Sequence, residues 1–438
     1  MLKIPICFAM MATVACGTAA TSGDGGGPPG TDGMSSPDGM STPPPLTGFL
    51  ADGGASCLGA GLGAALGHQH LMIGFAGDDA VASQAPFDVR YVYLSGGYAS
   101  GAGPCASCAM SCDVAGKSCA NSAGGCAWWG CYQYDQNPPG EYVRDFVSNA
   151  AKAGEVPMFT YYEILQASGV QEGTAEATQA ANNATFMARY YADFRFMLKQ
   201  IGNAPALVHV EPDFWGYAEQ ANVDPHLTAA AVASANAGDC GSLENSIAGF
   251  GQCLVKMTRT YAPNAKIGLH ASAWSTNMDV LLNTSASLDV VGEAKKTAKF
   301  LAAAGGDQMD FVVVDYSDRD TGYYKSMGRN TAWNENATLP NFTQALAWTQ
   351  AIGEAINKPV VVWQIPVGNS QMNDTCDHYK DNRVDYLMNH ADDVARAHVA
   401  LLAFGAGAGC QTTPSSDNGN LVAKTKALAA AGGQSSCP

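Results

Sequence analysis

Acidic and aromatic residues gather where several short apolar runs of the sequence end. The densest group is His209-Val210-Glu211-Pro212-Asp213-Phe214-Trp215, and two others read Tyr161-Tyr162-Glu163 and Asp315-Tyr316-Ser317-Asp318. Paired carboxyl groups can act as acid and base, or as acid and nucleophile, at the anomeric carbon of a sugar. Aromatic rings can stack on the C–H faces of a pyranose. These groups therefore predict a site that binds and cleaves carbohydrate.

We assign the acid role to Glu211 and the role of base for a water molecule to Asp315. The other acidic side chains of these groups are second-choice candidates for the catalytic roles: Asp213, Asp318 and Glu163. The expected sugar contacts come from the same groups, from two further strand ends and from a cysteine-rich segment. They are Tyr162, His209, Trp215, His270, Trp274, Tyr316, Trp363, Gln364 and Trp129.

Each candidate also fits a structural role. Glu211 suits a paired carboxylate inside a core, and Asp315 suits a cap for the turn that follows it. The three tryptophans at 215, 274 and 363 suit a cover over the core. His209, Glu211, His270 and Asp315 would suit a metal ion if they converged. These four residues show no His-x-x-x-His or similarly dense spacing, so we predict neither a metal site here nor a cofactor.

Eight short apolar runs, rich in β-branched and aromatic residues, predict the strands that position these groups. They are Leu71–Gly77, Val89–Leu94, Val156–Tyr162, Ala206–Glu211, Lys266–His270, Asp310–Asp315, Pro359–Gln364 and Val399–Phe404. Helical patterns occupy most gaps: Glu141–Ala153, Ala177–Ile201, Leu243–Ala262, Gly292–Ala304, Asn341–Ile356, Arg383–Ala397 and Leu421–Ala431.

This alternation predicts an α/β fold with parallel strands, and eight units predict a (β/α)8 TIM barrel. A doubly wound sheet is the alternative, but the glycine-rich phosphate motif after the first strand is missing. The gap 78–88 is too short for a full helix, so we expect an irregular barrel. In such a barrel the C-terminal strand ends build the active site.

Val210-Glu211-Pro212 resembles the Asn-Glu-Pro motif of a large clan of TIM-barrel glycoside hydrolases. The resemblance implies that Glu211 is the proton donor. Val210 replaces the Asn that would contact the sugar 2-hydroxyl. Strand seven ends in Gln364 where the clan places its nucleophilic Glu, and a Gln cannot form a glycosyl ester. Inversion of the anomeric configuration is therefore favoured over retention.

A second resemblance is to family 6 cellulases, which carry Ile-Glu-Pro-Asp on one strand and a His-Ala-Gly-Trp run after the next. Here Val210-Glu211-Pro212-Asp213 precedes His270-Ala271-Ser272-Ala273-Trp274 in the same order. The acidic loop that supplies that family's proton donor has no counterpart after strand two, where Ser95-Gly96-Gly97-Tyr98 stands.

The N-terminus predicts export. Lys3 precedes the apolar stretch 4–15, and Thr13-Val14-Ala15-Cys16-Gly17 resembles the bacterial lipobox, in which the Cys becomes lipidated. A plain secretory signal is the alternative. We assign residues 1–16 to this signal and 17–47, which are rich in Gly, Ser, Thr and Pro, to a disordered tether. Residues 48–438 form the catalytic domain.

Twelve cysteines remain beyond Cys7 and Cys16, and in an oxidising compartment they predict up to six disulfides. Six of them crowd into 105–131, which predicts a disulfide-rich insertion after strand two rather than a zinc knot. The aromatic end of this insertion, which includes Trp129, either walls a binding cleft or covers a helix. Outside it we consider the pairs Cys57–Cys437, Cys240–Cys253 and Cys376–Cys410.

The 438 residues carry a formal charge of −16, which repels nucleic acids and anionic lipid surfaces. We expect a monomer at the cell surface or outside the cell, a polysaccharide or oligosaccharide substrate, and membrane contact only through the lipid anchor. The alternatives are a lipoprotein that binds glycans without catalysis and a metal-assisted hydrolase that uses His209, Glu211, His270 and Asp315.

Overall fold

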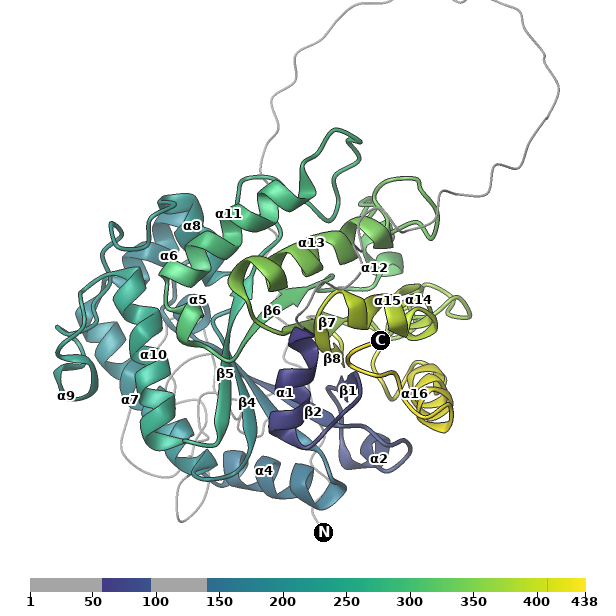
Figure 1. Ribbon diagram of the computed structural model, residues 1–438, viewed down its shortest axis with the longest axis horizontal. Coiled ribbons are helices and arrows are strands. Elements are labelled where there is room, and N and C mark those ends of the chain that lie inside the picture. The colour runs from purple at the N-terminus through teal and green to yellow at the C-terminus, as the bar shows by residue number, and fades with distance from the viewer. Residues whose placement is uncertain (1–56, 96–139, 408) are drawn as a thin grey trace, which may run out of the picture.

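Eight parallel strands close into a barrel in the computed structural model, which describes residues 57–95, 140–407 and 409–438 (Figure 1). The strands are β1 (Met72–Phe75), β2 (Val89–Ser95), β3 (Val156–Tyr162), β4 (Ala206–Val210), β5 (Ala265–Ala271), β6 (Phe311–Asp315), β7 (Val360–Ile365) and β8 (Val399–Phe404). Each strand pairs with the next, and β8 pairs with β1. The predicted TIM barrel is confirmed, with every predicted strand in place.

Side chains alternate along each strand between the barrel interior and the layer under the helices. On β7, Val361 and Trp363 belong to the interior cluster, whereas Val360, Val362 and Ile365 belong to the outer core. The same alternation on β4 points Leu207 inward and Val208 outward. The interior is filled with packed side chains, so chemistry can occur only at the ends of the barrel.

Helices surround the strands (Figure 1). They are α2 (Asp79–Ala82), α4 (Glu141–Ala153), α5 (Ile164–Ala167), α6 (Thr174–Ala181), α7 (Ala184–Ile201), α8 (Phe214–Ala221), α9 (Ala237–Cys240), α10 (Ile247–Tyr261), α11 (Val290–Ala303), α12 (Thr321–Ser326), α13 (Phe342–Ile356), α14 (Arg383–Asn389), α15 (Ala391–Arg396) and α16 (Asn420–Ala430). The first gap holds only the four-residue α2, which confirms the expected irregularity.

Two predicted helices are interrupted. The pattern 177–201 divides into α6 and α7 because Asn183 begins α7 by capping it, its side chain accepting a hydrogen bond from the Phe186 amide at 3.1 Å. The pattern 383–397 divides into α14 and α15 at His390. Both breaks lie at polar residues inside a continuous apolar pattern, which the periodicity alone does not detect.

A helix that the sequence did not predict, α1 (Leu58–Leu66), closes the N-terminal end of the barrel. Its Leu62 and Leu66 pack in the interior cluster beside Met72 and Leu401. The predicted disulfide Cys57–Cys437 joins the start of α1 to the end of the chain. The barrel is thus sealed at the end opposite the expected active site.

The other predicted cysteine pairs have different outcomes. Cys240–Cys253 is a disulfide that joins α9 to α10. Cys376 and Cys410 lie past β7 and β8 as expected, but both are free thiols, so the predicted bridge is not formed. A hydrogen bond with the Cys410 thiol raises the pKa of Cys376 to about 11.

Several predictions concern residues outside the described part of the chain. These are the signal and lipobox at 1–16, the tether at 17–47, the cysteine-rich insertion at 105–131 and Trp129. Among the described helices, none has the length and apolar character needed to cross a bilayer.

Candidate active site

Four polar side chains from neighbouring strands form a chain of contacts near the C-terminal end of the barrel. Thr160 Oγ1 of β3 lies 3.2 Å from His209 Nδ1 of β4, and His209 Nε2 lies 3.2 Å from His270 Nδ1 of β5. His270 Nε2 lies 3.1 Å from Asp315 Oδ1 at the end of β6. Parallel register places Thr160 opposite His209 and so aligns the start of this chain.

One arrangement of protons satisfies all three contacts. If His270 Nε2 donates to the Asp315 carboxylate, His270 Nδ1 accepts from His209 Nε2, and His209 Nδ1 accepts from the Thr160 hydroxyl. Burial and the neighbouring His270 hold the pKa of His209 well below its usual range, so this ring is neutral as the arrangement requires. The chain therefore fixes the orientation of Asp315, whose side chain remains 28% exposed.

Aromatic rings support this chain from β2 and β7. The Trp363 ring lies 4.7 Å from His209 and 5.4 Å from Tyr93, measured between ring centroids. Trp363 is 3% exposed, so it forms the floor under the polar chain and offers no open face to a sugar. Trp363 thus lies beside the polar chain, and its surroundings suit a packing role.

Tyr93 is a site residue that the sequence analysis missed. Its hydroxyl is buried without a hydrogen-bond partner in the described part of the chain. Burial raises its pKa, and the charges of Asp213, Asp315 and Asp318 raise it further. Its ring packs against Trp363, which places Tyr93 beside the polar chain. The alternation of β2 would have pointed Tyr91 and Tyr93 inward together.

Asp213 lies at the same mouth, directly before α8. Its Oδ2 accepts a hydrogen bond from the Tyr162 hydroxyl at 3.0 Å. Burial raises the pKa of Asp213 to about 7, with a further increase from the charge of Asp315. Asp213 as a whole residue is partly exposed, and the charge of Asp315 acts on its pKa. It combines a place at the mouth with partial protonation near neutral pH.

Glu211 has a different environment. Its side chain is completely buried, and its two oxygens accept hydrogen bonds from the Glu163 amide at 3.1 Å and the Ile164 amide at 3.0 Å. Burial raises its pKa to about 8. The carboxyl is thus held at the start of α5, and this position does not fit a proton donor that a substrate must reach.

The remaining predicted residues divide between the mouth and the core. Trp215 stacks on Phe250, and the hydroxyl groups of Tyr316 and Thr349 share a hydrogen bond. Trp215 and Tyr316 both lie in the outer core, so neither position fits a sugar contact. Trp274 is partly exposed and packs on Tyr217 with ring centroids 4.7 Å apart. Glu163 is buried at the start of α5. The Asp318 carboxylate is bound by Arg319 and Tyr324. Gln364, at the end of β7, has a backbone φ of 54°.

Of the four residues considered for a metal, His209, His270 and Asp315 contact one another in a chain, and Glu211 is bonded elsewhere. Both ring nitrogens of His209 and of His270 have hydrogen-bond partners, and Glu211 faces α5. In the described residues, one group of three potential metal ligands has its donor atoms within 4.8 Å of one another, and it lies elsewhere.

Three buried or partly buried carboxyl groups predict that stability falls as pH rises. The pKa values of Glu211, Asp213 and Glu219 are raised to about 8, 7 and 7 by burial. In the unfolded chain such groups ionise near pH 4, so between about pH 4 and 8 the folded state binds more protons. Each group lowers the stability only between about pH 4 and its own folded pKa, by at most about 1.4 kcal/mol per pH unit.

Denaturant unfolding at pH 5 and pH 8 measures this dependence. We expect a higher free energy of unfolding at pH 5, and a smaller difference between the two values in Glu219→Gln. A free energy of unfolding that rises from pH 5 to pH 8 would contradict the assignment.

No family model matches the sequence, and no curated protein matches it. Similar solved structures include a modular endo-β-1,4-mannanase from Cellulomonas fimi, with 10% identity, 86% of this chain and 75% of that chain covered, and a TM-score of 0.45. A family 26 β-mannanase from Bacteroides ovatus has 8% identity, 85% and 94% coverage, and a TM-score of 0.41.

A family 39 glycoside hydrolase from Bacteroides cellulosilyticus WH2 has 13% identity, 81% and 64% coverage, and a TM-score of 0.40. At these scores the likeness carries no argument about activity. The barrel itself is established by its own strand pairing.

Proposed function

We propose that this protein is a glycoside hydrolase that cleaves a polysaccharide or oligosaccharide in a single displacement. The observation that carries the proposal is the pair Asp213 and Asp315 at one barrel mouth, with Asp315 oriented by His270 and Asp213 held by Tyr162. Asp213 has the raised pKa that a proton donor needs near neutral pH. It takes the role that the sequence analysis gave to Glu211.

In this mechanism Asp213 protonates the glycosidic oxygen as its bond to the anomeric carbon breaks. Asp315 removes a proton from a water molecule, and the water oxygen forms the new bond to that carbon. Asp315 keeps its orientation because His270 Nε2 donates to it. The product sugar has the inverted configuration. Gln364 at the end of β7 cannot form the ester of a double displacement, which supports this route.

Among the described residues, Tyr93, Tyr162, Tyr217 and Trp274 are aromatic side chains at or beside this mouth that suit contact with the sugar. Glu211 acts as a positioning residue in this proposal. Its bonds to the Glu163 and Ile164 amides join the end of β4 to the segment that follows Tyr162. A carboxyl group whose two oxygens accept amide hydrogen bonds holds the two strand ends together.

A panel of soluble polysaccharides, assayed for released reducing ends, tests the activity. We expect release from at least one member by the wild-type protein, and no release by the double variant Asp213→Asn/Asp315→Asn. Binding of a glycan without release of reducing ends would favour the alternative of a non-catalytic glycan-binding protein.

We also propose that the protein is an exported monomer anchored to a membrane through lipidated Cys16. The acyl chains would supply the membrane affinity, because a chain of charge −16 supplies none. Cys16→Ser should move the protein from the membrane fraction of cells to the soluble fraction. If this variant stays in the membrane fraction, the proposed lipid anchor at Cys16 is wrong.

A further inference from the structure

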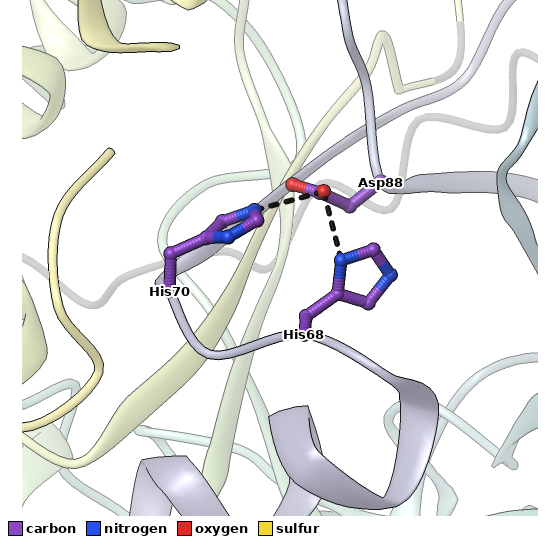
Figure 2. A group of neighbouring side chains, drawn as sticks. All are labelled: His68, His70 and Asp88. Atoms are coloured by element: carbon purple, nitrogen blue, oxygen red, sulfur yellow. Dashed lines mark hydrogen bonds and ion pairs between the residues drawn. The ribbon is translucent and has the colours of Figure 1, made fainter. Parts of the chain in front are cut away.

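Two histidines and one aspartate converge at the N-terminal end of the barrel (Figure 2). His68 and His70 lie in the link between α1 and β1, and Asp88 lies directly before β2. His68 Nδ1 is 3.2 Å from Asp88 Oδ1, and His70 Nε2 is 2.9 Å from the same oxygen. Three potential ligand atoms therefore face one point from two segments of the chain.

These separations fit a small metal ion. Zinc lies about 2.0–2.2 Å from imidazole nitrogen and carboxylate oxygen, so two ligands at a tetrahedral angle are about 3.3 Å apart. The contacts of 3.2 and 2.9 Å, which are hydrogen-bonding distances, differ from this value by a few tenths of an ångström, and the two ring nitrogens lie within 4.8 Å of each other. The nitrogen donors favour zinc or a similar transition metal over calcium or magnesium, which prefer oxygen.

The surroundings hold the ligands in place. Asp88 Oδ2 accepts a hydrogen bond from the Ile73 amide at 2.8 Å, which orients the carboxylate and leaves Oδ1 toward the two rings. The backbone of His70 forms a bridge with Ser435, and the Leu71 amide donates to Gln434 O at 2.7 Å. Metal sites need such outer contacts to fix their ligands.

The site is also accessible to an ion. The His70 side chain is 41% exposed, whereas those of His68 and Asp88 are 17% and 10% exposed. An ion can therefore enter past His70, and a water molecule can complete its coordination. The formal charge of −16 favours a cation over an anion.

We propose that His68, His70 and Asp88 bind one zinc ion or a chemically similar divalent transition metal. The ion would join the link after α1 to the start of β2, beside the C-terminal segment that pairs with His70. This end of a TIM barrel serves stability and lies opposite the mouth that holds Asp213 and Asp315. The expected consequence of binding is a more stable fold.

Zinc binding to the full-length protein, stripped of metal with a chelator, tests the proposal. Calorimetry should detect binding at this site, and the melting temperature should rise with zinc concentration because zinc binds the folded state. His70→Ala should lower the affinity more than about 100-fold, which exceeds the loss from removing a mere outer contact. Asp88→Asn keeps an acceptor for the Ile73 amide and should lower it as well.

His226→Ala is the matched control, since His226 is also a half-exposed histidine paired with a carboxylate, that of Glu244. It should leave zinc affinity and the zinc-dependent rise in melting temperature unchanged. Cobalt substitution distinguishes this site from cysteines, because binding by His68, His70 and Asp88 gives no thiolate-to-cobalt charge-transfer band. Equal zinc affinity in wild type and His70→Ala would overturn the proposal. So would a cobalt spectrum that disappears when the cysteine thiols are alkylated but not in His70→Ala.

Discussion

Replacing Asp213 by Asn is expected to lower turnover of an unactivated glycoside by about 10²–10⁴. The substitution keeps the shape of the side chain and an oxygen that can accept from Tyr162, but removes the proton that the leaving group needs. A substrate whose leaving group requires little protonation should lose much less rate. The fall in wild-type activity above about pH 7, where Asp213 ionises, should disappear in the variant. Steady-state kinetics on both substrates over pH 5–9 measures these effects.

Glu211→Gln is the control for this variant. An amide can accept a hydrogen bond at only one of its two terminal atoms, so it leaves the Glu163 or Ile164 amide without its partner. We expect a loss of about 1–3 kcal/mol in the free energy of unfolding, and equal effects on substrates with good and poor leaving groups. If Glu211→Gln instead shows the leaving-group dependence and Asp213→Asn does not, the proton donor is Glu211.

Replacing Asp315 by Asn is expected to lower turnover by a similar factor of about 10²–10⁴. The amide oxygen can still accept from His270 Nε2, so the chain from Thr160 to His270 keeps its geometry, but the base for water is lost. A good leaving group should not restore this variant, because protonation of the leaving group is not the missing step. Kinetics on the same two substrates separate the role of Asp315 from that of Asp213.

Asp318→Asn is the matched control, because Asp318 follows the same strand as Asp315 and was a reserve candidate by sequence. Its carboxylate is already bound by Arg319 and by the Tyr324 hydroxyl. We expect turnover to fall by less than about tenfold, which is well below the effect of losing a general base. A larger loss in Asp318→Asn than in Asp315→Asn would assign the base to Asp318.

The barrel could be predicted because each strand is a short apolar run followed by a separate helical pattern. Helix α1 was not predicted, since Leu58–Leu66 is rich in glycine and its three helically spaced leucines stand in a short segment of small residues. Its role depends on Leu62 and Leu66 entering the open end of the barrel. Only the closed barrel creates that place for them.

The sequence predicted which strand ends carry the candidate site, but not which side chain at each strand end faces the mouth. Beyond Val210 the backbone leaves the extended conformation, with φ of 53° at Glu211 and 64° at Asp213. The alternation of a strand no longer applies there, so sequence could not decide which carboxyl faces the mouth. By contrast, alternation does separate Asp315 from Tyr316 and would have excluded the latter as a sugar contact.

The metal ligands show a further limit of sequence patterns. His68-Gln69-His70 is a short motif, but its carboxylate is Asp88, which lies beyond the whole of β1 and α2. A search of the sequence for closely spaced metal-binding residues finds the two histidines and misses Asp88. The pairing of β1 with β2 brings the two segments together.

The configuration of the first product tests the central claim most directly, since the claim is a single displacement with Asp213 as acid and Asp315 as base. Proton NMR, recorded while the wild-type protein cleaves the polysaccharide identified by the panel, distinguishes the two anomers before mutarotation mixes them. The account predicts that the first-formed reducing end has the configuration opposite to that of the cleaved bond. A product that first appears with the original configuration would contradict it, because retention requires a nucleophile that forms a covalent intermediate.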